Sequence, residues 1–395
     1  MIAFDLTPEQ KEMQARARRF AQEEVAPIAA EYDRRGEHPA FVIERAYQEG
    51  LINLAIPAEY GGGGKGGVTN CLVTEELGAA CAGVTTTIMV NSLATTPLVL
   101  FGTEEQNMAF LEPLCQQHQL AAFCLTEREA GSDASNVRTT AVRDGDSYLI
   151  NGCKCFISNG SIASLYTVFA LTDPERGARG MSALIVPADA PGISIPKVED
   201  KMGQRASNTA EILFSNVRVP QENLLSREGH GFAVALKTLD YARAGVAALA
   251  TGVARHAVEL ATGYAQQRIQ FGKPIADLQG IQFMLADMGM LVEASRLLAW
   301  QAAWLADQGL PNGKESAIAK CFASDAAMRC ATDAVQIFGG YGYMRDYPVE
   351  KLLRDAKLLQ IYEGTNQIQR LVIARSLLKG RQDRDDRIAV GVSHG

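Results

Sequence analysis

The chain has 395 residues, more than one ordinary hydrophobic core accommodates, so we expect two or three domains. Hydrophobic residues make up 47% and charged residues 21%, a balance typical of a soluble globular protein. The net charge of -7 and the lack of a basic stripe disfavour a nucleic-acid partner.

Residues 1–120 have the pattern of a helical N-terminal domain. Thr7, Pro8 and Glu9 form a typical helix start rather than a signal peptide, and we see no apolar run near the roughly 20 residues that span a bilayer. We therefore expect a cytoplasmic protein without membrane insertion. Helical spacing predicts helices over residues 9–30, 41–50 and 71–80. The GGGGKGG segment at 61–67 predicts a loop, and a phosphate loop is disfavoured because Lys65 is followed by Gly66 rather than Ser or Thr.

Residues 121–229 predict a β domain of short strands. Thr, Val and Ile alternate with polar residues, as expected for strands with one buried face. Asp144, Gly145 and Asp146 separate two such runs, which indicates a hairpin. The pattern favours a barrel-like or sandwich domain over alternating strands and helices.

Residues 230–380 predict a four-helix bundle. Only Pro274, Pro311 and Pro348 interrupt this part of the chain, and proline ends helices because it lacks an N–H and clashes with the preceding turn. The helical segments are 230–267, 277–308, 313–338 and, in two pieces, 349–379. The charged segment 381–395 is expected to be a flexible tail. The predicted fold class is therefore α+β, with helical, β and helical domains in that order.

The segment LQIYEGTNQIQRL at 359–371 contains the most informative carboxylate. Glu363 precedes Gly364, which can adopt unusual backbone angles, and Thr365 is a plausible N-cap for the next helix. On spacing alone, a solvated glutamate near a helix N-terminus is the commoner interpretation. Arg243 is a second candidate, because an arginine within an apolar helix needs an anionic partner.

The sequence offers no strong signal for a metal site. Its eight cysteines form no C-x-x-C pair and its five histidines no H-E-x-x-H motif, so we expect reduced, mostly buried thiols. We also find no Ser-His-Asp pattern and no Rossmann glycine fingerprint.

Several separated motifs together resemble the acyl-CoA dehydrogenase family, over residues 6–379. The motifs are FCLTEREAGSD, INGCKCFISNG, MGQRASNTAEILFSNVRVP, TLDYARAGVAA, QFGKPI with LQGIQFMLADM, DAVQIFGGYGY and IYEGTNQIQR. The resemblance is greatest to the short-chain and medium-chain branch. It implies the three-domain fold, non-covalent FAD, and a homotetramer in which the flavin site is shared between subunits.

The resemblance also assigns roles to residues. Flavin contacts are implied for Phe123, Leu125, Thr126, Gly131, Ser132, Phe156, Ile157, Ser158, Arg268, Phe271, Gln279, Gln336, Gly339, Gly340, Thr365 and Gln367. Acyl-CoA contacts are implied for Ser132, Asp240, Tyr241, Arg243 and Gly364. Many relatives have Trp and Thr where this chain has Phe156 and Ser158. Phe keeps an aromatic face and Ser a hydroxyl, so FAD binding is still expected.

Glu363 matches the family's catalytic base. Some branches place the acid on the helix that here carries Ala242, and alanine cannot act as a base. The implied reaction is α,β-dehydrogenation of an acyl-CoA to a trans-2-enoyl-CoA, with electrons passed to an electron-transfer flavoprotein. The resemblance also implies that the pocket floor is formed by residues 85–92 and 241–245, where the bulky Met89, Val90 and Tyr241 suggest a short or branched acyl group. The alternatives are an acyl-CoA oxidase that uses oxygen, a monooxygenase, which the Glu disfavours, and a non-catalytic acyl-CoA-binding protein.

Overall fold

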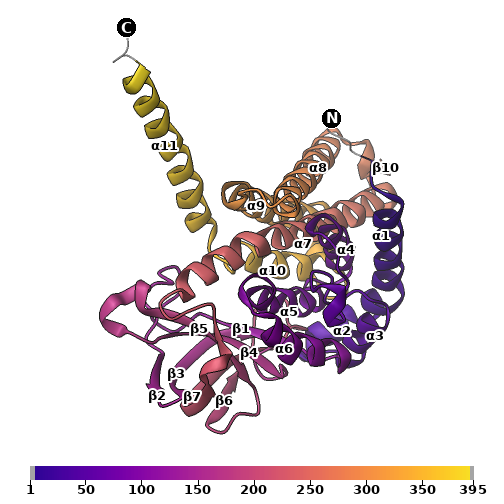
Figure 1. Cartoon of the computed structure of the whole chain (residues 1–395). Coiled ribbons are helices and arrows are strands. Elements are labelled where there is room, and N and C mark those ends of the chain that lie inside the picture. Colours follow the sequence, from indigo (N-terminus) through magenta and orange to yellow (C-terminus); the bar gives the residue numbers. More distant parts are fainter. Residues whose placement is uncertain (1–4, 392–395) are drawn as a thin grey trace.

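The computed structural model describes residues 5–391 and has three regions in the predicted order (Figure 1). Helices α1–α6 form the N-terminal region, strands β1–β8 the central region, and helices α7–α11 the C-terminal region. The predicted boundary at 120 lies between the end of α6 and the start of β1, and the boundary at 229 lies between β8 and α7.

The N-terminal region consists of the helices α1 (Pro8–Phe20), α2 (Ala26–Arg35), α3 (Ala40–Gln48), α4 (Gly67–Ala80), α5 (Ala82–Phe101) and α6 (Glu104–Gln116). Thr7 begins α1 with a capping box, since its side chain accepts from the Gln10 N–H at 3.2 Å and Gln10 bonds back to it. A π-helical turn, Ala21–Val25, separates α1 from α2, where the sequence predicted one continuous helix.

Helix α5 corrects the expectation that no apolar run approaches membrane-spanning length. By length and hydropathy it could cross a bilayer, but 72% of the qualifying stretch is buried inside the protein. Its place between α4 and β1 explains this composition, because a helix that is packed on all sides needs no polar face.

The central region is an eight-stranded sheet with the order β6-β7-β3-β2-β4-β5-β8, in which β1 pairs in parallel with β4. The strands are β1 (Ala121–Cys124), β2 (Thr140–Asp144), β3 (Ser147–Ser158), β4 (Leu165–Leu171), β5 (Met181–Pro187), β6 (Ile193–Val198), β7 (Thr209–Pro220) and β8 (Leu224–Leu225). The predicted hairpin is confirmed: Asp144 pairs with Ser147, and Gly145 turns the chain with φ of 66°.

The C-terminal region contains the helices α7 (Gly231–Gln267), α8 (Gln279–Asp307), α9 (Gly313–Phe338), α10 (Val349–Leu359) and α11 (Asn366–Gly391). A small hairpin, β9 (Ile269–Gln270) and β10 (Lys273–Pro274), connects α7 to α8. The predicted segments match these helices. The segment expected to be a flexible tail continues α11 as helix to Gly391, and its residues 392–395 lie outside the described residues. Figure 1 shows α11 projecting away from the rest of the chain.

Helix α7 is the central element and packs against α4, α8 and α9. Its buried face is rich in alanine, which lets neighbouring helices approach closely. At Gly252 a Cβ atom would lie 2.3 Å from the Glu75 carbonyl oxygen of α4, so only glycine fits this crossing.

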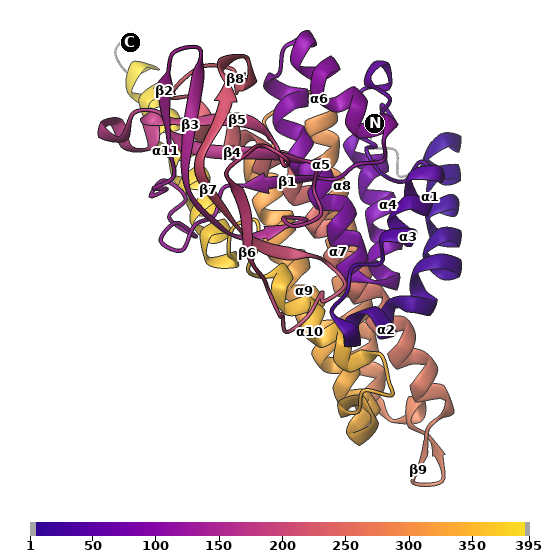
Figure 2. The ribbon, with the colours of Figure 1, turned by 90° about the horizontal axis from the view of Figure 1, so that it is seen from below.

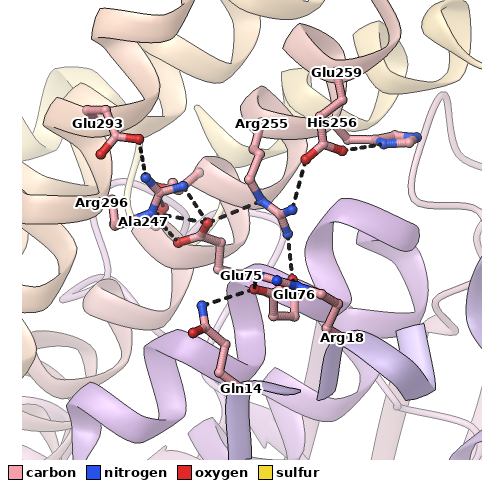
Figure 3. A network of polar contacts seen from close by, with 11 residues as sticks. Gln14, Arg18, Glu75, Glu76, Ala247, Arg255, His256, Glu259, Glu293 and Arg296 are labelled. Atoms are coloured by element: carbon pink, nitrogen blue, oxygen red, sulfur yellow. Dashed lines mark hydrogen bonds and ion pairs between the residues drawn. The ribbon is translucent and has the colours of Figure 1, made fainter. Parts of the chain in front are cut away.

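A charge network around two buried carboxylates joins the N-terminal helices to the bundle (Figure 3). Glu75 and Glu76 of α4 are each 3% exposed. Glu75 accepts from Arg296 of α8 at 2.8 Å, and Glu76 accepts from Arg18 of α1 at 2.7 Å and from Arg255 of α7 at 2.8 Å. Four helices are therefore connected through two adjacent carboxylates.

Candidate active site

A cavity of about 800 Å³ lies where the β region meets the bundle. Its walls come from the β1 end and the loop after it, the end of β3, helix α7, and the connection from α10 to α11. The structure brings together here many of the residues that the sequence singled out: Phe123, Leu125, Thr126, Gly131, Ser132, Phe156, Ile157, Ser158, Arg243, Glu363 and Gly364.

The connection between α10 and α11 holds Glu363 in an unusual backbone conformation. Glu363 has φ of 53° and Gly364 has φ of 92°, both in the left-handed region. Thr365 then begins α11, since its hydroxyl oxygen accepts from the Ile368 N–H at 3.3 Å, as predicted for an N-cap. Strained residues of this kind persist only where the surroundings hold them, and they concentrate at functional sites.

The Glu363 carboxylate is poised between its two protonation states. Its Oε2 atom is buried and has no hydrogen-bond partner among the described residues. Burial raises the pKa of Glu363 to about 7, while the charges of Arg243 and Lys320 act in the opposite direction. The carboxylate can therefore accept a proton near neutral pH and has a lone pair free to do so.

Arg243 is buried as the sequence predicted, and its anionic partner is Asp240. The guanidinium is 4% exposed and donates to Asp240 Oδ1 at 2.8 Å. Its Nε atom lies 3.4 Å from the Glu363 carbonyl oxygen. Burial lowers the pKa of Arg243 and raises the pKa of Asp240. Arg243 thus contacts the backbone of the loop that carries Glu363.

Tyr241 lies in the lining of a second cavity, of about 250 Å³, between α4, α5, α7 and α8. Met89 and Gly245 also line it, whereas Val90 lines the Glu363 cavity. Leu93 contributes to both. The Met89 Sδ atom lies 3.5 Å from where a Cβ of Gly245 would stand, so Met89 fills the space beside this glycine.

On the sheet side, the Phe156 ring is presented to the cavity by an irregularity in β3. The pairing register of β3 with β7 shifts between Lys154 and Ile157, and Phe156 has φ of 57° and is 65% exposed. With Thr126 and Ser158 nearby in the cavity wall, this gives an aromatic face bordered by hydroxyl groups.

Sequence reasoning missed the buried ion pair that supports this wall. Lys154 is 0% exposed and donates to Glu127 at 2.7 Å and to the Leu125 carbonyl at 3.0 Å. Glu127 also accepts from the Thr139 N–H at 3.1 Å. The pair fixes the segment after β1, and its members are 27 residues apart in the chain, so no local pattern indicates it.

A second group of predicted residues lies elsewhere. Arg268, Gly339 and Gly340 line an open pocket of about 590 Å³, and the Arg268 guanidinium stands 5.5 Å from the Tyr341 ring centroid. Phe271, at the tip of the β9–β10 hairpin, is 91% exposed. Figure 2 shows this hairpin at the opposite end of the molecule from the sheet.

The remaining predicted residues are near one of these two groups. Gln279 is the first residue of α8, and Gln336 precedes the Gly339 turn at the end of α9. Gln367 is exposed in the first turn of α11, two residues after Thr365. Within one chain, the residues of the second group do not join the Glu363 cavity.

Family comparisons account for nearly the whole chain. Residues 7–118, 122–217 and 229–378 match the N-terminal, middle and C-terminal domain models of acyl-CoA dehydrogenase. The chain belongs to the acyl-CoA dehydrogenase family.

A relative and two solved structures illustrate this membership. An acyl-CoA dehydrogenase of Bacillus subtilis is 48% identical over 376 residues, covering 95% of this chain and 99% of the relative. Butyryl-CoA dehydrogenase from Megasphaera elsdenii is 44% identical with a TM-score of 0.93, covering 95% and 100%. A structure described as the electron transferring flavoprotein of Acidaminococcus fermentans, from work on electron bifurcation, is 46% identical with a TM-score of 0.94 and the same coverage.

This acyl-CoA dehydrogenase is a flavoprotein oxidoreductase whose cofactor is FAD. The residues present fit a flavin: the cavity of about 800 Å³ combines the exposed Phe156 face with hydroxyl groups and with the Glu363 Oε2 atom, which has no hydrogen-bond partner in the described part of the chain. Phe156 and Ser158 of this wall are among the residues that would hold the flavin, a role that stays a prediction from the family resemblance. Membership of an enzyme family also disfavours the alternative of a non-catalytic binding protein.

Proposed function

We propose that this protein removes hydrogen from the α and β carbons of a short-chain or branched acyl-CoA, giving the trans-2-enoyl-CoA, with Glu363 as the base. The observation that carries the proposal is the Glu363 carboxylate in the cavity wall: one of its oxygens lacks a hydrogen-bond partner among residues 5–378, and burial raises its pKa to about 7. When bound, FAD supplies the acceptor for the β-hydrogen, which leaves as hydride.

The protein's own residues would carry the proton chemistry. Glu363 takes the α proton, and its raised pKa makes it a stronger base than an exposed carboxylate. Two side chains fix the backbone of the loop that carries Glu363, because Arg243 and Gln369 both donate to the Glu363 carbonyl oxygen, at 3.4 and 3.3 Å. Such support fixes the direction of the base toward the cavity. The backbone N–H of Glu363 would donate to the thioester carbonyl and stabilise developing negative charge there.

The preference for a short acyl group is argued from the second cavity. Met89 and Tyr241 line that cavity, and the two cavities share Leu93. In this arrangement Met89 would limit how far the acyl chain extends between α5 and α7. The similarity to butyryl-CoA dehydrogenase from Megasphaera elsdenii agrees with a short substrate.

A panel of acyl-CoA substrates tests this proposal. Purified holoenzyme would be assayed with butyryl-, isobutyryl-, hexanoyl- and octanoyl-CoA and an artificial electron acceptor. We expect the highest kcat/KM with one of the two four-carbon acyl groups, butyryl or isobutyryl. Equal or higher values for octanoyl-CoA would contradict the proposed specificity, and no turnover of any substrate would contradict the proposed reaction.

We further propose an electron-transfer flavoprotein as the electron acceptor, supported by the likeness to the Acidaminococcus structure. The alternative is an oxidase, which passes electrons directly to oxygen. Stopped-flow mixing of the reduced enzyme with air-saturated buffer separates the two: slow reoxidation supports the dehydrogenase, and reoxidation at the rate of turnover supports the oxidase.

A homotetramer with shared flavin sites is also proposed. Phe283, Met290, Leu297 and Trp304 of α8 recur every seven residues and are 46–64% exposed, so they form an apolar stripe along the helix. Arg268 and Glu363 line separate pockets within one chain, and the β9–β10 hairpin next to Arg268 lies at the far end of the molecule from the sheet (Figure 2), which agrees with a flavin that contacts two subunits. Light scattering on the eluting holoenzyme would measure its mass.

A further inference from the structure

Lys320 is a buried lysine directly behind the loop that carries Glu363. It lies in α9, and its side chain is 0% exposed. The Nζ atom donates to the Gly364 carbonyl oxygen at 2.8 Å and to Asn366 Oδ1 at 2.9 Å. Gly364 belongs to the loop and Asn366 begins α11, so Lys320 connects α9 to both sides of the Thr365 cap.

The environment of Lys320 differs from that of other buried lysines in the chain. Lys154 is paired with Glu127 at 2.7 Å and Lys351 with Asp355 at 2.6 Å. Lys320 has no carboxylate oxygen within 4 Å in the described part of the chain, and its acceptors are neutral oxygens. Burying an ammonium group without a counter-ion is costly. A structural clamp needs only a hydrogen-bond donor here, so the charge itself requires an explanation.

The nearby charge is that of Glu363. Burial raises the pKa of Glu363, and the positive charges of Arg243 on α7 and Lys320 on α9 act in the opposite direction. Burial lowers the pKa of Lys320 to about 8, and the charge of Glu363 opposes this shift. The other titratable or charged groups around the loop and cavity include Tyr362, Asp240, Asp325, Asp133, Arg375, Cys321 and Arg370. Of these two cations, Arg243 is paired with Asp240, whereas Lys320 has no carboxylate oxygen within 4 Å among the described residues.

We propose that Lys320 is a positioning residue for the reaction: it fixes the Gly364 carbonyl and supplies a positive charge behind the loop that favours the ionised form of Glu363. This inference rests on the proposed role of Glu363 as base. Gln369 donates to the same Gly364 carbonyl at 3.0 Å, so the loop retains one anchor when Lys320 is replaced. The positive charge of Lys320, by contrast, is lost when a neutral residue replaces it.

Acetoacetyl-CoA separates proton transfer from turnover. Its C2 proton is acidic, and its C3 carbon carries no hydrogen. Glu363 can accept the C2 proton, which converts the ligand to its enolate. Because C3 carries no hydrogen, no hydride is transferred and the flavin stays oxidised. The ultraviolet absorbance of the bound enolate, recorded on holoenzyme across pH 5.5 to 9.5, then gives the midpoint of deprotonation at equilibrium.

Three variants would be compared with the wild type. Lys320→Met removes charge and hydrogen bond, Lys320→Gln removes the charge but keeps a donor, and Ser324→Ala removes a hydroxyl bonded to Asn366 at 3.1 Å without changing charge. We expect the midpoint to rise by about one pH unit in both Lys320 variants, as for loss of a nearby opposite charge. Ser324→Ala should match the wild type. Lys320→Met should also form less enolate at high pH than Lys320→Gln.

Several results would overturn the inference. Wild-type midpoints in both Lys320 variants would reduce Lys320 to a packing role, and so would the same shift in Ser324→Ala. If Lys320→Met loses its flavin, the midpoint of Lys320→Gln alone tests the inference. Loss of flavin in both variants would mean that Lys320 has only a structural role. If the wild type forms no enolate and butyryl-CoA does not reduce its flavin, the proposed function fails as well. If the wild type forms the enolate and its flavin is reduced by butyryl-CoA, but the midpoints of the Lys320 variants equal that of the wild type, only the role of Lys320 is refuted.

Discussion

The pH dependence of kcat/KM gives the sharpest test of Glu363 as the base. With a pKa of about 7, the ionised fraction of this carboxylate is about 9% at pH 6 and about 91% at pH 8. The rate at low substrate concentration should therefore fall about tenfold between pH 8 and pH 6, because kcat/KM reports the free enzyme. An exposed glutamate, with a pKa near about 4.3, would be almost fully ionised at both values and would give a flat profile.

The assay would follow anaerobic flavin bleaching with butyryl-CoA at concentrations well below KM. A phosphate of CoA has a pKa near about 6 and could contribute to the profile, so butyryl-pantetheine, which lacks the nucleotide phosphate, serves as the control substrate. We expect the same midpoint with both substrates. A rate that is constant from pH 6 to 8 would refute the reasoning, since it would mean that the base is not the buried Glu363 carboxylate.

Glu363→Gln should keep the flavin absorbance near 450 nm and bind acyl-CoA, while slowing flavin reduction by about 10²- to 10⁴-fold; substantial retained turnover would contradict the assignment. The same variant should melt at a higher temperature than wild type at pH 8 but not at pH 4, because a raised pKa favours the protonated form and the stability it provides is lost as pH rises through about 7. Met89→Ala should raise kcat/KM for octanoyl-CoA relative to butyryl-CoA, whereas the exposed Met108→Ala should leave the ratio unchanged; an unchanged ratio in both would remove Met89 as a chain-length determinant. Lys154→Met should lower the free energy of unfolding in urea by about 3–5 kcal/mol, because it leaves Glu127 buried and unpaired, and adding Glu127→Gln should recover part of this loss.

Local chemistry made the main elements predictable. The Thr7 and Thr365 caps, the turn at Gly145, and the prolines that separate the bundle helices each act within a few residues of the chain. The three-region order followed from these signals. Helices α5 and α6 were harder to assign, because each contains an internal proline, Pro97 or Pro113, and α5 is buried too completely to show a periodic pattern.

The site was predictable where its residues belong to continuous motifs, and obscure where it depends on contacts between distant segments. Glu363, Gly364 and Phe156 stand in motifs that the family resemblance covers. Lys320 lies 44 residues from the Gly364 carbonyl that it holds, and Lys154 lies 27 residues from Glu127. No pattern in the sequence indicates such pairs, because burial and partner choice are decided by how the helices and strands pack.

The Glu75 and Glu76 network has a consequence for how the chain unfolds (Figure 3). Detaching α1 would leave Glu76 without Arg18, and pulling α4 from the bundle would expose two carboxylates and two arginines that depend on each other. Three regions in the sequence need not then be three independent units of unfolding. The N-terminal helices and the bundle should unfold in one cooperative transition, although the whole β region lies between them in the sequence.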